Sequence, residues 1–381
     1  MKKAILYPLI ALLVILGGAG VYFAQNPNSF LELFNFLNPQ TPGPQGLIPQ
    51  EEIQLVEQEI TINGVKRTLR IPARFKIEVY AAGFDRPRLL AINPQTGDLY
   101  VTDTGAGEVW NVSKKEKVLS GIKSVHGIAF FEGDLYLAST TSIFRYQNGK
   151  LETLVNNLPS GGHYTATLVF GPDGKMYLSR GSSCNVCEGE KRRAAILRFD
   201  KNGENEEVFA TGLRNDVGMT FHPQTKELWT TENGRDYLGN NLPPEEINII
   251  REGKHYGWPY CYSANVPDPD FGSTEICADK EPPYIEMQAH SAPLGLRFDG
   301  EAKNLYIAFH GSWNRTTPTG YKVVRISNPL GEAKIADYIT GWRTGKAAAW
   351  GRPADVIFDE AGNMYISDDA AGVIYRLSKV N

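Results

Sequence analysis

The chain has 381 residues, of which 22% are charged and 42% hydrophobic, and its formal net charge is −4 at pH 7. A slightly acidic chain offers no electrostatic basis for binding nucleic acid. The basic run at residues 191–193 is short and is interpreted as part of a solvated loop.

The N-terminal segment is apolar. Residues 4–24 carry no charge and follow Lys2 and Lys3. As a helix they would span about 32 Å, roughly the thickness of a bilayer's hydrocarbon core. The two lysines favour a cytoplasmic N-terminus and an exported remainder. We therefore predict a transmembrane anchor over residues 1–24. A cleaved signal peptide is the alternative, although Tyr22 is a poor −3 residue for cleavage after Ala24.

A linker and a hairpin follow. Residues 25–50 are rich in Pro, Asn and Gln, as linkers often are. The globular part is expected over residues 51–381. It begins with a predicted hairpin over residues 59–71, whose turn is Asn63-Gly64, because Asn-Gly favours the type I′ geometry.

One unit then repeats six times. Each copy has a short apolar strand, a turn, a second strand containing Tyr or Trp, and a third apolar strand. The second strands contain Leu99-Tyr100, Leu135-Tyr136, Met176-Tyr177, Leu228-Trp229, Leu305-Tyr306 and Met364-Tyr365. A period of roughly 40–50 residues with several short strands is typical of β-propellers. The sequence predicts an all-β, six-bladed β-propeller preceded by the N-terminal helix.

Arg or His stands just before or at the start of each inner strand. The positions are Arg86, His126, His163, Arg214, His290 and Arg352. The inner strands of a propeller start at one mouth of the channel, so these residues predict a cationic pocket for a ligand with several carboxylates or phosphates. The alternative is that each arginine bonds neighbouring carbonyls or acidic groups. His163 follows Gly161-Gly162, and an imidazole at this mouth could accept a proton near neutral pH.

The fourth repeat contains the longest loop between its strands. It runs through Asn233-Gly234-Arg235-Asp236 to Glu245-Glu246. Backbone carbonyls of a glycine-containing turn near a carboxylate suit Ca²⁺. An ordinary turn is the alternative.

The four cysteines predict two disulfides in an exported protein, Cys184–Cys187 and Cys261–Cys277. A four-cysteine zinc site is the alternative, but the second pair is too widely spaced for a usual zinc ligand pair. Glu188 follows the first pair where a c-type haem site would have His.

Four stretches resemble one family: residues 163–187, 214–262, 290–326 and 350–377. They are similar to the L-sorbosone dehydrogenase branch of the glucose/sorbosone dehydrogenase family, over roughly residues 68–378. Members are six-bladed propellers that use pyrroloquinoline quinone (PQQ) and Ca²⁺. The resemblance implies that His163 is the general base and that Arg214, Asn215 and Arg352 contact PQQ. It also implies that Ca²⁺ is held by the backbone carbonyls of Gly234 and Arg235.

The chain departs from the soluble glucose dehydrogenases of that family at four positions. Gly162 replaces an Asp, Arg235 a Pro, and Ala354 a second Arg. A PQQ-contacting Lys has no clear counterpart, and we expect Arg315 to replace it. These changes put glucose specificity in doubt.

Together, the N-terminal segment and the resemblance imply an exported, membrane-tethered dehydrogenase that oxidises an aldose, sorbosone or a pyranose. An external quinone or cytochrome would receive the electrons, since the chain has no haem motif. Two other functions stay open: a Ca²⁺-dependent, lactonase-like hydrolase and a non-catalytic binding propeller.

Overall fold

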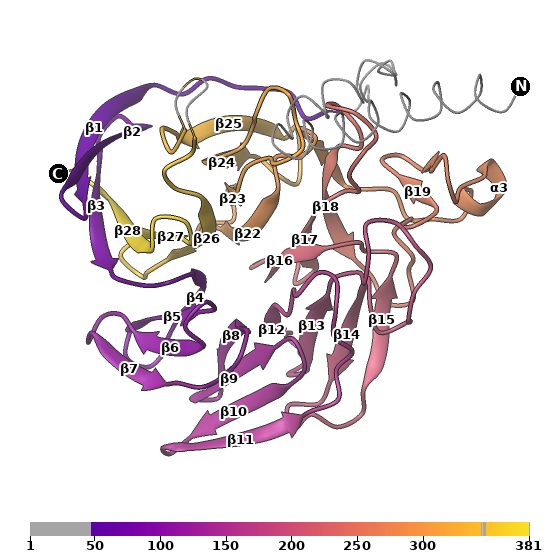
Figure 1. Cartoon of the computed structure of the whole chain (residues 1–381), viewed down its shortest axis with the longest axis horizontal. Coiled ribbons are helices and arrows are strands. Elements are labelled where there is room, and N and C mark those ends of the chain that lie inside the picture. The colour runs from indigo at the N-terminus through magenta and orange to yellow at the C-terminus, as the bar shows by residue number, and fades with distance from the viewer. Residues whose placement is uncertain (1–46, 344, 346–347, 381) are drawn as a thin grey trace, which may run out of the picture.

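The computed structural model describes residues 47–343, 345 and 348–380. In this part of the chain, six four-stranded antiparallel sheets stand around a common centre (Figure 1). Their innermost strands contact one another in a closed circle, and the innermost strand of the sixth sheet contacts that of the first. The predicted six-bladed propeller is confirmed.

Each blade is a meander that runs outward from the channel. The strands of blades one to three are β4 (Pro87–Ile92), β5 (Leu99–Asp103), β6 (Glu108–Asn111) and β7 (Glu116–Leu119); β8 (Val125–Phe131), β9 (Asp134–Ser139), β10 (Ile143–Gln147) and β11 (Lys150–Val155); β12 (Leu168–Phe170), β13 (Met176–Arg180), β14 (Ala195–Phe199) and β15 (Glu207–Thr211). Those of blades four to six are β16 (Asp216–Phe221), β17 (Leu228–Glu232), β18 (Glu245–Ile250) and β21 (Ile285–Met287); β22 (Pro293–Phe298), β23 (Asn304–Phe309), β24 (Lys322–Ser327) and β25 (Lys334–Ile339); β26 (Pro353–Phe358), β27 (Met364–Asp368), β28 (Val373–Lys379) and β3 (Phe75–Ala82).

The outer strand of blade six comes from the other end of the described chain. β3 pairs with β28 in antiparallel register, with Ile77 opposite Leu377 and Ala82 opposite Val373. Figure 1 shows this indigo strand beside the yellow C-terminal strands. The ring is therefore closed by hydrogen bonds between residues about 300 positions apart, a pairing that the repeat pattern did not predict.

Two small elements lie outside the blades. The predicted hairpin is formed by β1 (Leu55–Ile62) and β2 (Val65–Pro72). Both turn residues, Asn63 and Gly64, have positive φ, as a type I′ turn requires. A long excursion between β18 and β21 contains β19 (Cys261–Tyr262), β20 (Val266–Pro267) and the one-turn helix α3 (Thr274–Cys277).

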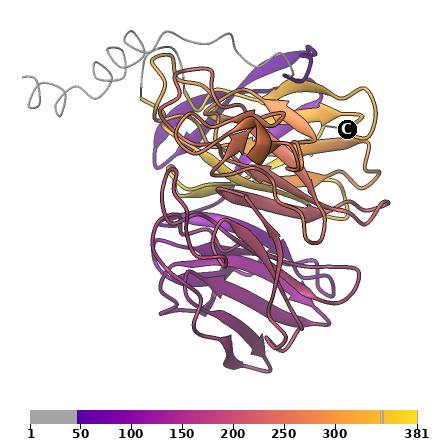
Figure 2. The same cartoon turned by 90° about the vertical axis from the view of Figure 1, so that its right-hand side faces the viewer.

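The core is divided among the junctions between blades. An apolar cluster fills each of the six junctions in the described part of the chain. Edge-to-face aromatic pairs cross several of them, such as Tyr100 with Phe130 and Tyr306 with Phe358. Figure 2 shows the blades from the side. Rigid junctions fix the starts of the inner strands, and those starts build the site described next.

The predicted membrane anchor and most of the predicted linker lie outside the described residues. Among the residues that are described, no helix is long and apolar enough to cross a bilayer.

Candidate active site

A cavity of about 410 Å³ opens at the channel mouth where the inner strands begin. Residues from four of the six blades, namely one, three, four and five, line it. They are Arg88, His163, Tyr164, Thr165, Arg214, Asn215, Val217, Asn233, Gly234, Asp236, Glu245, His290, Ala292, Leu294, His310, Gly311, Trp313 and Asn314. His163, Arg214, Asn215 and Gly234 were predicted site residues, and the fold brings these four together.

The loop before β12 places His163. Gly162 has a φ of 63°, and a Cβ at this position would lie 2.4–2.5 Å from the backbone of Ser182 and Ser183. An aspartate, as in the glucose dehydrogenases, would therefore be strained and crowded here. The glycine lets the His163 loop pack directly against the next segment of its own blade.

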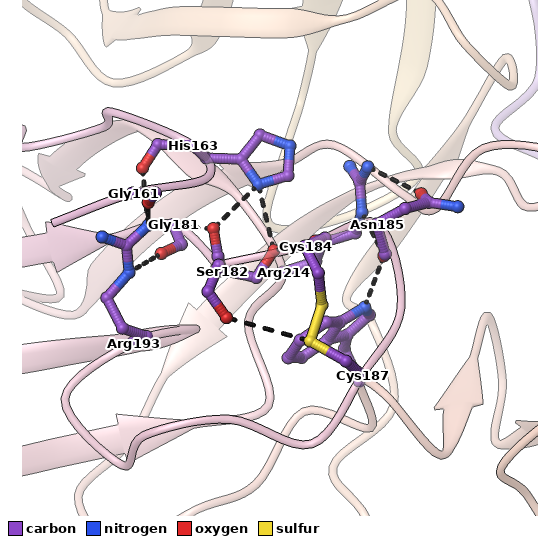
Figure 3. Close-up of a disulfide and its surroundings, with 11 residues drawn as sticks. Gly161, His163, Gly181, Ser182, Cys184, Asn185, Cys187, Arg193 and Arg214 are labelled. Carbon is purple, nitrogen blue, oxygen red and sulfur yellow. Dashed lines mark hydrogen bonds between the residues drawn. A yellow bond between two sulfur atoms is a disulfide. The ribbon is translucent and has the colours of Figure 1, made fainter.

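Hydrogen bonds then fix the tautomer of His163 (Figure 3). Its Nδ1 lies 3.0 Å from Ser182 Oγ and 3.2 Å from the Ser182 carbonyl oxygen. The Ser182 hydroxyl donates its only hydrogen to the Cys184 carbonyl at 2.6 Å, so it accepts from His163. Nδ1 therefore carries the hydrogen, and Nε2 keeps its lone pair.

The charge state of His163 agrees with a role as a base. Burial and the positive charge of Arg214 lower the pKa of His163 to about 4. The imidazole is thus neutral at pH 7, and no described residue makes a hydrogen bond to Nε2. His290, by contrast, has both ring nitrogens within hydrogen-bond distance of protein groups, Gly239 O at 2.8 Å and Asn314 Nδ2 at 3.2 Å.

Arg214 is buried, and its guanidinium donates four hydrogen bonds. Its Nε donates to the Asn185 carbonyl at 2.9 Å and its Nη1 to the Asn233 carbonyl at 3.0 Å. Its Nη2 donates to Asn185 Oδ1 at 2.9 Å and to Asp236 Oδ2 at 3.1 Å. These bonds use four of the five N–H groups of the guanidinium, leaving one on Nη1. Neighbouring Asn215 accepts from Thr165 Oγ1 through its side-chain oxygen.

The predicted cation site lies beside this arginine. Gly234 donates its N–H to Glu245 Oε2 at 2.8 Å, and the Ala292 N–H reaches the other oxygen at 3.1 Å. Burial raises the pKa of Glu245 to about 7. The Arg235 side chain turns away to buried Asp268, with N–O distances of 2.7 and 2.8 Å. Its backbone can thus stay at the site while its charge is neutralised elsewhere.

Arg315 and Arg352, the two arginines besides Arg214 that were predicted to contact PQQ, do not line the cavity. Arg315 bonds loop carbonyls, including Thr317 and Ala289 at 3.1 Å each. Arg352 donates from Nε to the His310 carbonyl at 3.0 Å and from Nη2 to the carbonyl of cavity-lining Gly311.

The predicted ring at the mouth is only partly formed. Arg86 is exposed and outside the cavity, and His126 is fully buried in β8. Only His163, Arg214 and His290 of the six ring positions line the cavity.

Arg88, two residues after Arg86, supplies the charge of blade one. It lies inside β4 and forms a buried ion pair with Asp369 at 2.5 Å. The other carboxylate oxygen of Asp369 lies 2.8 Å from His310 Nε2. Buried Arg88 Nε has no hydrogen-bond partner among the described residues. Sequence patterns did not single out Arg88, because it lies inside a predicted strand and not before its start.

The interpretation of residues 191–193 as part of a solvated loop is wrong for Arg193, whose side chain is buried and only 5% exposed. Its guanidinium donates to the carbonyls of Gly181, Pro159, His163 and Ser182 at 2.6–2.9 Å, and also to that of Gly161. Figure 3 shows it beneath the His163 loop. Arg193 therefore fixes the segments that hold the candidate base.

Both predicted disulfides are present, Cys184–Cys187 and Cys261–Cys277. No free cysteine remains in the chain, and the zinc alternative is excluded. Cys184–Cys187 closes a tight loop next to Arg214 (Figure 3), whereas Cys261–Cys277 lies in the excursion of blade four.

The fold and this site define a six-bladed propeller with a buried polar pocket, lined by histidine and arginine, at one channel mouth. A family model described as TrAA12-like matches residues 69–380. The chain belongs to this TrAA12-like family.

Several relatives have long matches. A protein of Borreliella burgdorferi named only as uncharacterized is 31% identical, covering 85% of this chain and 93% of its own. The pyrroloquinoline quinone-dependent sugar dehydrogenase of Hypocrea jecorina is 23% identical, over 84% and 93% of the two chains. The pyrroloquinoline quinone-dependent pyranose dehydrogenase of Coprinopsis cinerea is 24% identical over 81% of this chain, which spans about half (54%) of that enzyme.

Solved structures agree on the fold. A calcium structure of a Trichoderma reesei carbohydrate-active enzyme of family AA12 superposes with a TM-score of 0.74. It is 21% identical, with 89% of this chain and 100% of that one covered. The holo form of the PQQ domain of the Coprinopsis cinerea pyranose dehydrogenase gives 0.70 at 22% identity, over 87% and 100% of the chains.

Proposed function

We propose that this protein is a PQQ- and Ca²⁺-dependent sugar dehydrogenase with His163 as its general base. The observation that carries the proposal is a neutral imidazole, its tautomer fixed and its Nε2 unpaired by any described residue, beside Arg214 in a buried pocket. The relatives with assigned activities add support, because their names describe PQQ-dependent dehydrogenases of sugars.

The residues of the cavity fit PQQ. Its carboxylates require cationic donors, and Arg214 and Arg88 supply them from two sides of the cavity. The Nε of Arg88 is buried without a described partner, which is costly unless a ligand completes its hydrogen bonding. Asn215 would add a neutral contact, and Arg352 and Arg315 would act from the rim.

The fit to Ca²⁺ rests on backbone atoms. No described residue donates to the carbonyl oxygens of Gly234 and Arg235, and Glu245 and Asp236 line the same part of the cavity. Among the described residues, no cluster of three His, Cys, Asp or Glu side chains could hold a metal alone. The ion would therefore be shared between backbone carbonyls and the bound cofactor, as a hard cation can be.

When bound, PQQ supplies the electron acceptor, and Ca²⁺ polarises it. The protein's part is to orient the sugar and to move one proton. His163 Nε2 accepts the proton of the substrate hydroxyl, and the Nδ1–H bond to Ser182 holds the ring in place. Trp313 and Tyr164 are 60% and 43% exposed at the cavity, so their apolar faces are available to the carbon face of a sugar ring.

Two disulfides support export to an oxidising compartment. The electrons would pass to an external quinone or cytochrome. The N-terminal membrane tether stays a prediction, and carbonate extraction of membranes would test it.

Reconstitution tests the function. Chelator-treated protein is titrated with PQQ and Ca²⁺, and the holoprotein is then screened with aldoses, sorbosone and polyols for dye reduction. We expect a bound-quinone absorbance and sugar-dependent dye reduction that both require PQQ. Lactone hydrolysis without PQQ would instead establish the hydrolase, and absence of both binding and turnover would establish a non-catalytic propeller.

A further inference from the structure

The loop closed by Cys184–Cys187 contacts two residues that line the cavity, Arg214 and Asp236. Asn185 lies between the two cysteines and bonds Arg214 twice, through its carbonyl and through Oδ1. The same Oδ1 accepts the Asp236 N–H at 2.8 Å, and Nδ2 reaches the Asp236 carbonyl at 3.3 Å. One asparagine therefore joins blades three and four at the cavity.

The loop is itself anchored. The Asn185 carbonyl also accepts from Trp258 Nε1 at 3.1 Å, and Trp258 is buried in the excursion of blade four. On the other side, the Cys184 carbonyl accepts the Ser182 hydroxyl hydrogen. That bond makes Ser182 Oγ an acceptor toward His163, and together with the Ser182 carbonyl it selects the His163 tautomer with a free Nε2.

We propose that Asn185, held in the Cys184–Cys187 loop, is a positioning residue that sets the orientation of Arg214, while the same loop sets the tautomer of His163 through Ser182. The inference deepens the proposed function and rests on it for the cofactor. Without the disulfide, the four-residue loop gains conformational freedom. Arg214 would then lose two of its four bonds and would meet a carboxylate ligand less well oriented.

The variants are Asn185→Ala and the double change Cys184→Ser with Cys187→Ser. Their matched controls are Asn202→Ala, in an exposed turn, and Cys261→Ser with Cys277→Ser, which removes the other disulfide outside the cavity lining. Asn185→Asp keeps the accepting oxygen and serves as the conservative variant. All are compared with the parent by thermal unfolding, so that loss of fold is recognised.

The first readout is PQQ affinity of the full chain with Ca²⁺. We expect Asn185→Ala to weaken PQQ binding by about 10- to 100-fold, with Asn185→Asp between it and the parent and both controls unchanged. If Asn185→Ala binds PQQ as tightly as Asn202→Ala does, the positioning role is wrong.

The second readout needs no cofactor. ¹⁵N-histidine NMR at pH 7 reports which ring nitrogen carries the hydrogen, and a His163→Gln spectrum assigns the signal among the six histidines. We expect one tautomer, Nδ1–H, in the parent and a mixture after loss of Cys184–Cys187 but not of Cys261–Cys277. An unchanged spectrum overturns the role of the loop. If the parent shows the single tautomer but binds no PQQ, the proposed function fails while the positioning of His163 stands.

Discussion

His163 is set apart from the other histidines by what its nitrogens contact. Nδ1 is committed to Ser182, Nε2 has no described partner, and the pKa is lowered to about 4 by burial and Arg214. His126 lies fully buried in a strand, and His290 uses both nitrogens. A base must have a free lone pair that reaches substrate, and His163 meets this requirement.

We expect His163→Ala to bind PQQ and Ca²⁺ nearly as the parent does but to reduce its cofactor with sugar about 10²- to 10⁴-fold more slowly, because general-base assistance is lost. Anaerobic rapid mixing of holoprotein with sugar isolates this half-reaction from reoxidation by dye. A variant that is reduced at the parent rate would place the base elsewhere, with His290 and His310 the next residues to test.

Arg214 should act through its remaining N–H group and its charge. Arg214→Ala is expected to weaken PQQ binding by about 10- to 150-fold, the value of a charge-assisted hydrogen bond. Arg86→Ala is the matched control, since Arg86 is exposed and outside the cavity. Equal affinities in a PQQ titration of the two variants would mean that Arg214 serves the fold alone.

At the scale of elements, blade four carries an unusual row of acids. Asp216, Glu232, Glu246 and Glu286 stand directly opposite one another across β16, β17, β18 and β21. All four are 2–7% exposed. Like charges opposite each other destabilise a sheet, so this blade is expected to hold protons that an unfolded chain would release. Burial raises the pKa of Asp216 to about 7, against 3.8 for an exposed aspartate.

The raised pKa of Asp216 determines how the stability of the fold depends on pH. Between about pH 4 and 7 the folded protein keeps a proton on Asp216 that the unfolded chain loses, so the contribution of this carboxyl to stability falls as the pH rises. Asp216→Asn removes the titration. Its stability relative to the parent should grow by about 2–3 kcal/mol from pH 5 to pH 8. Thermal unfolding in chelator at both pH values measures this, and a pH-independent difference would contradict it.

The repeated strands of the blades were the part of the structure that the sequence predicted best. Strand alternation and a regular period were enough to predict six blades and to place His163, Arg214 and Asn215 at the channel mouth, because the start of an inner strand has a fixed place in a propeller. Gly234 lies in the loop after β17 and was expected near the site from its glycine-containing turn and from the family resemblance. Arg315 was harder to place, since its loop follows no period, and Arg352, although it precedes the inner strand β26, bonds carbonyls of another loop instead of lining the cavity. Asn185 and Ser182 act through contacts between segments, which no local pattern encodes.

At the scale of the whole molecule, ring closure rests on β3. Ile77 is 1% exposed in the cluster between blades five and six, which also contains Leu377 and Val356. Ile77→Ala should lower the free energy of unfolding by about 2–5 kcal/mol through the cavity it leaves. Val65→Ala, on a side chain that is 48% exposed in the β1–β2 hairpin, should change it by about 0.5 kcal/mol or less. Similar losses in the two variants would show that β3 adds little to the closed ring.

The same closure bears on how the protein is made. A ribosome delivers β28 only after the strands of the first five blades, so the sixth blade cannot form until the sequence of the other five has been made. Until residue 379 is available, the edges of β3 and β27 are unpaired and able to join strands of other molecules. The ring therefore cannot close before β28 has left the ribosome. A cell that makes this protein has to keep the growing chain from its neighbours until β28 is available.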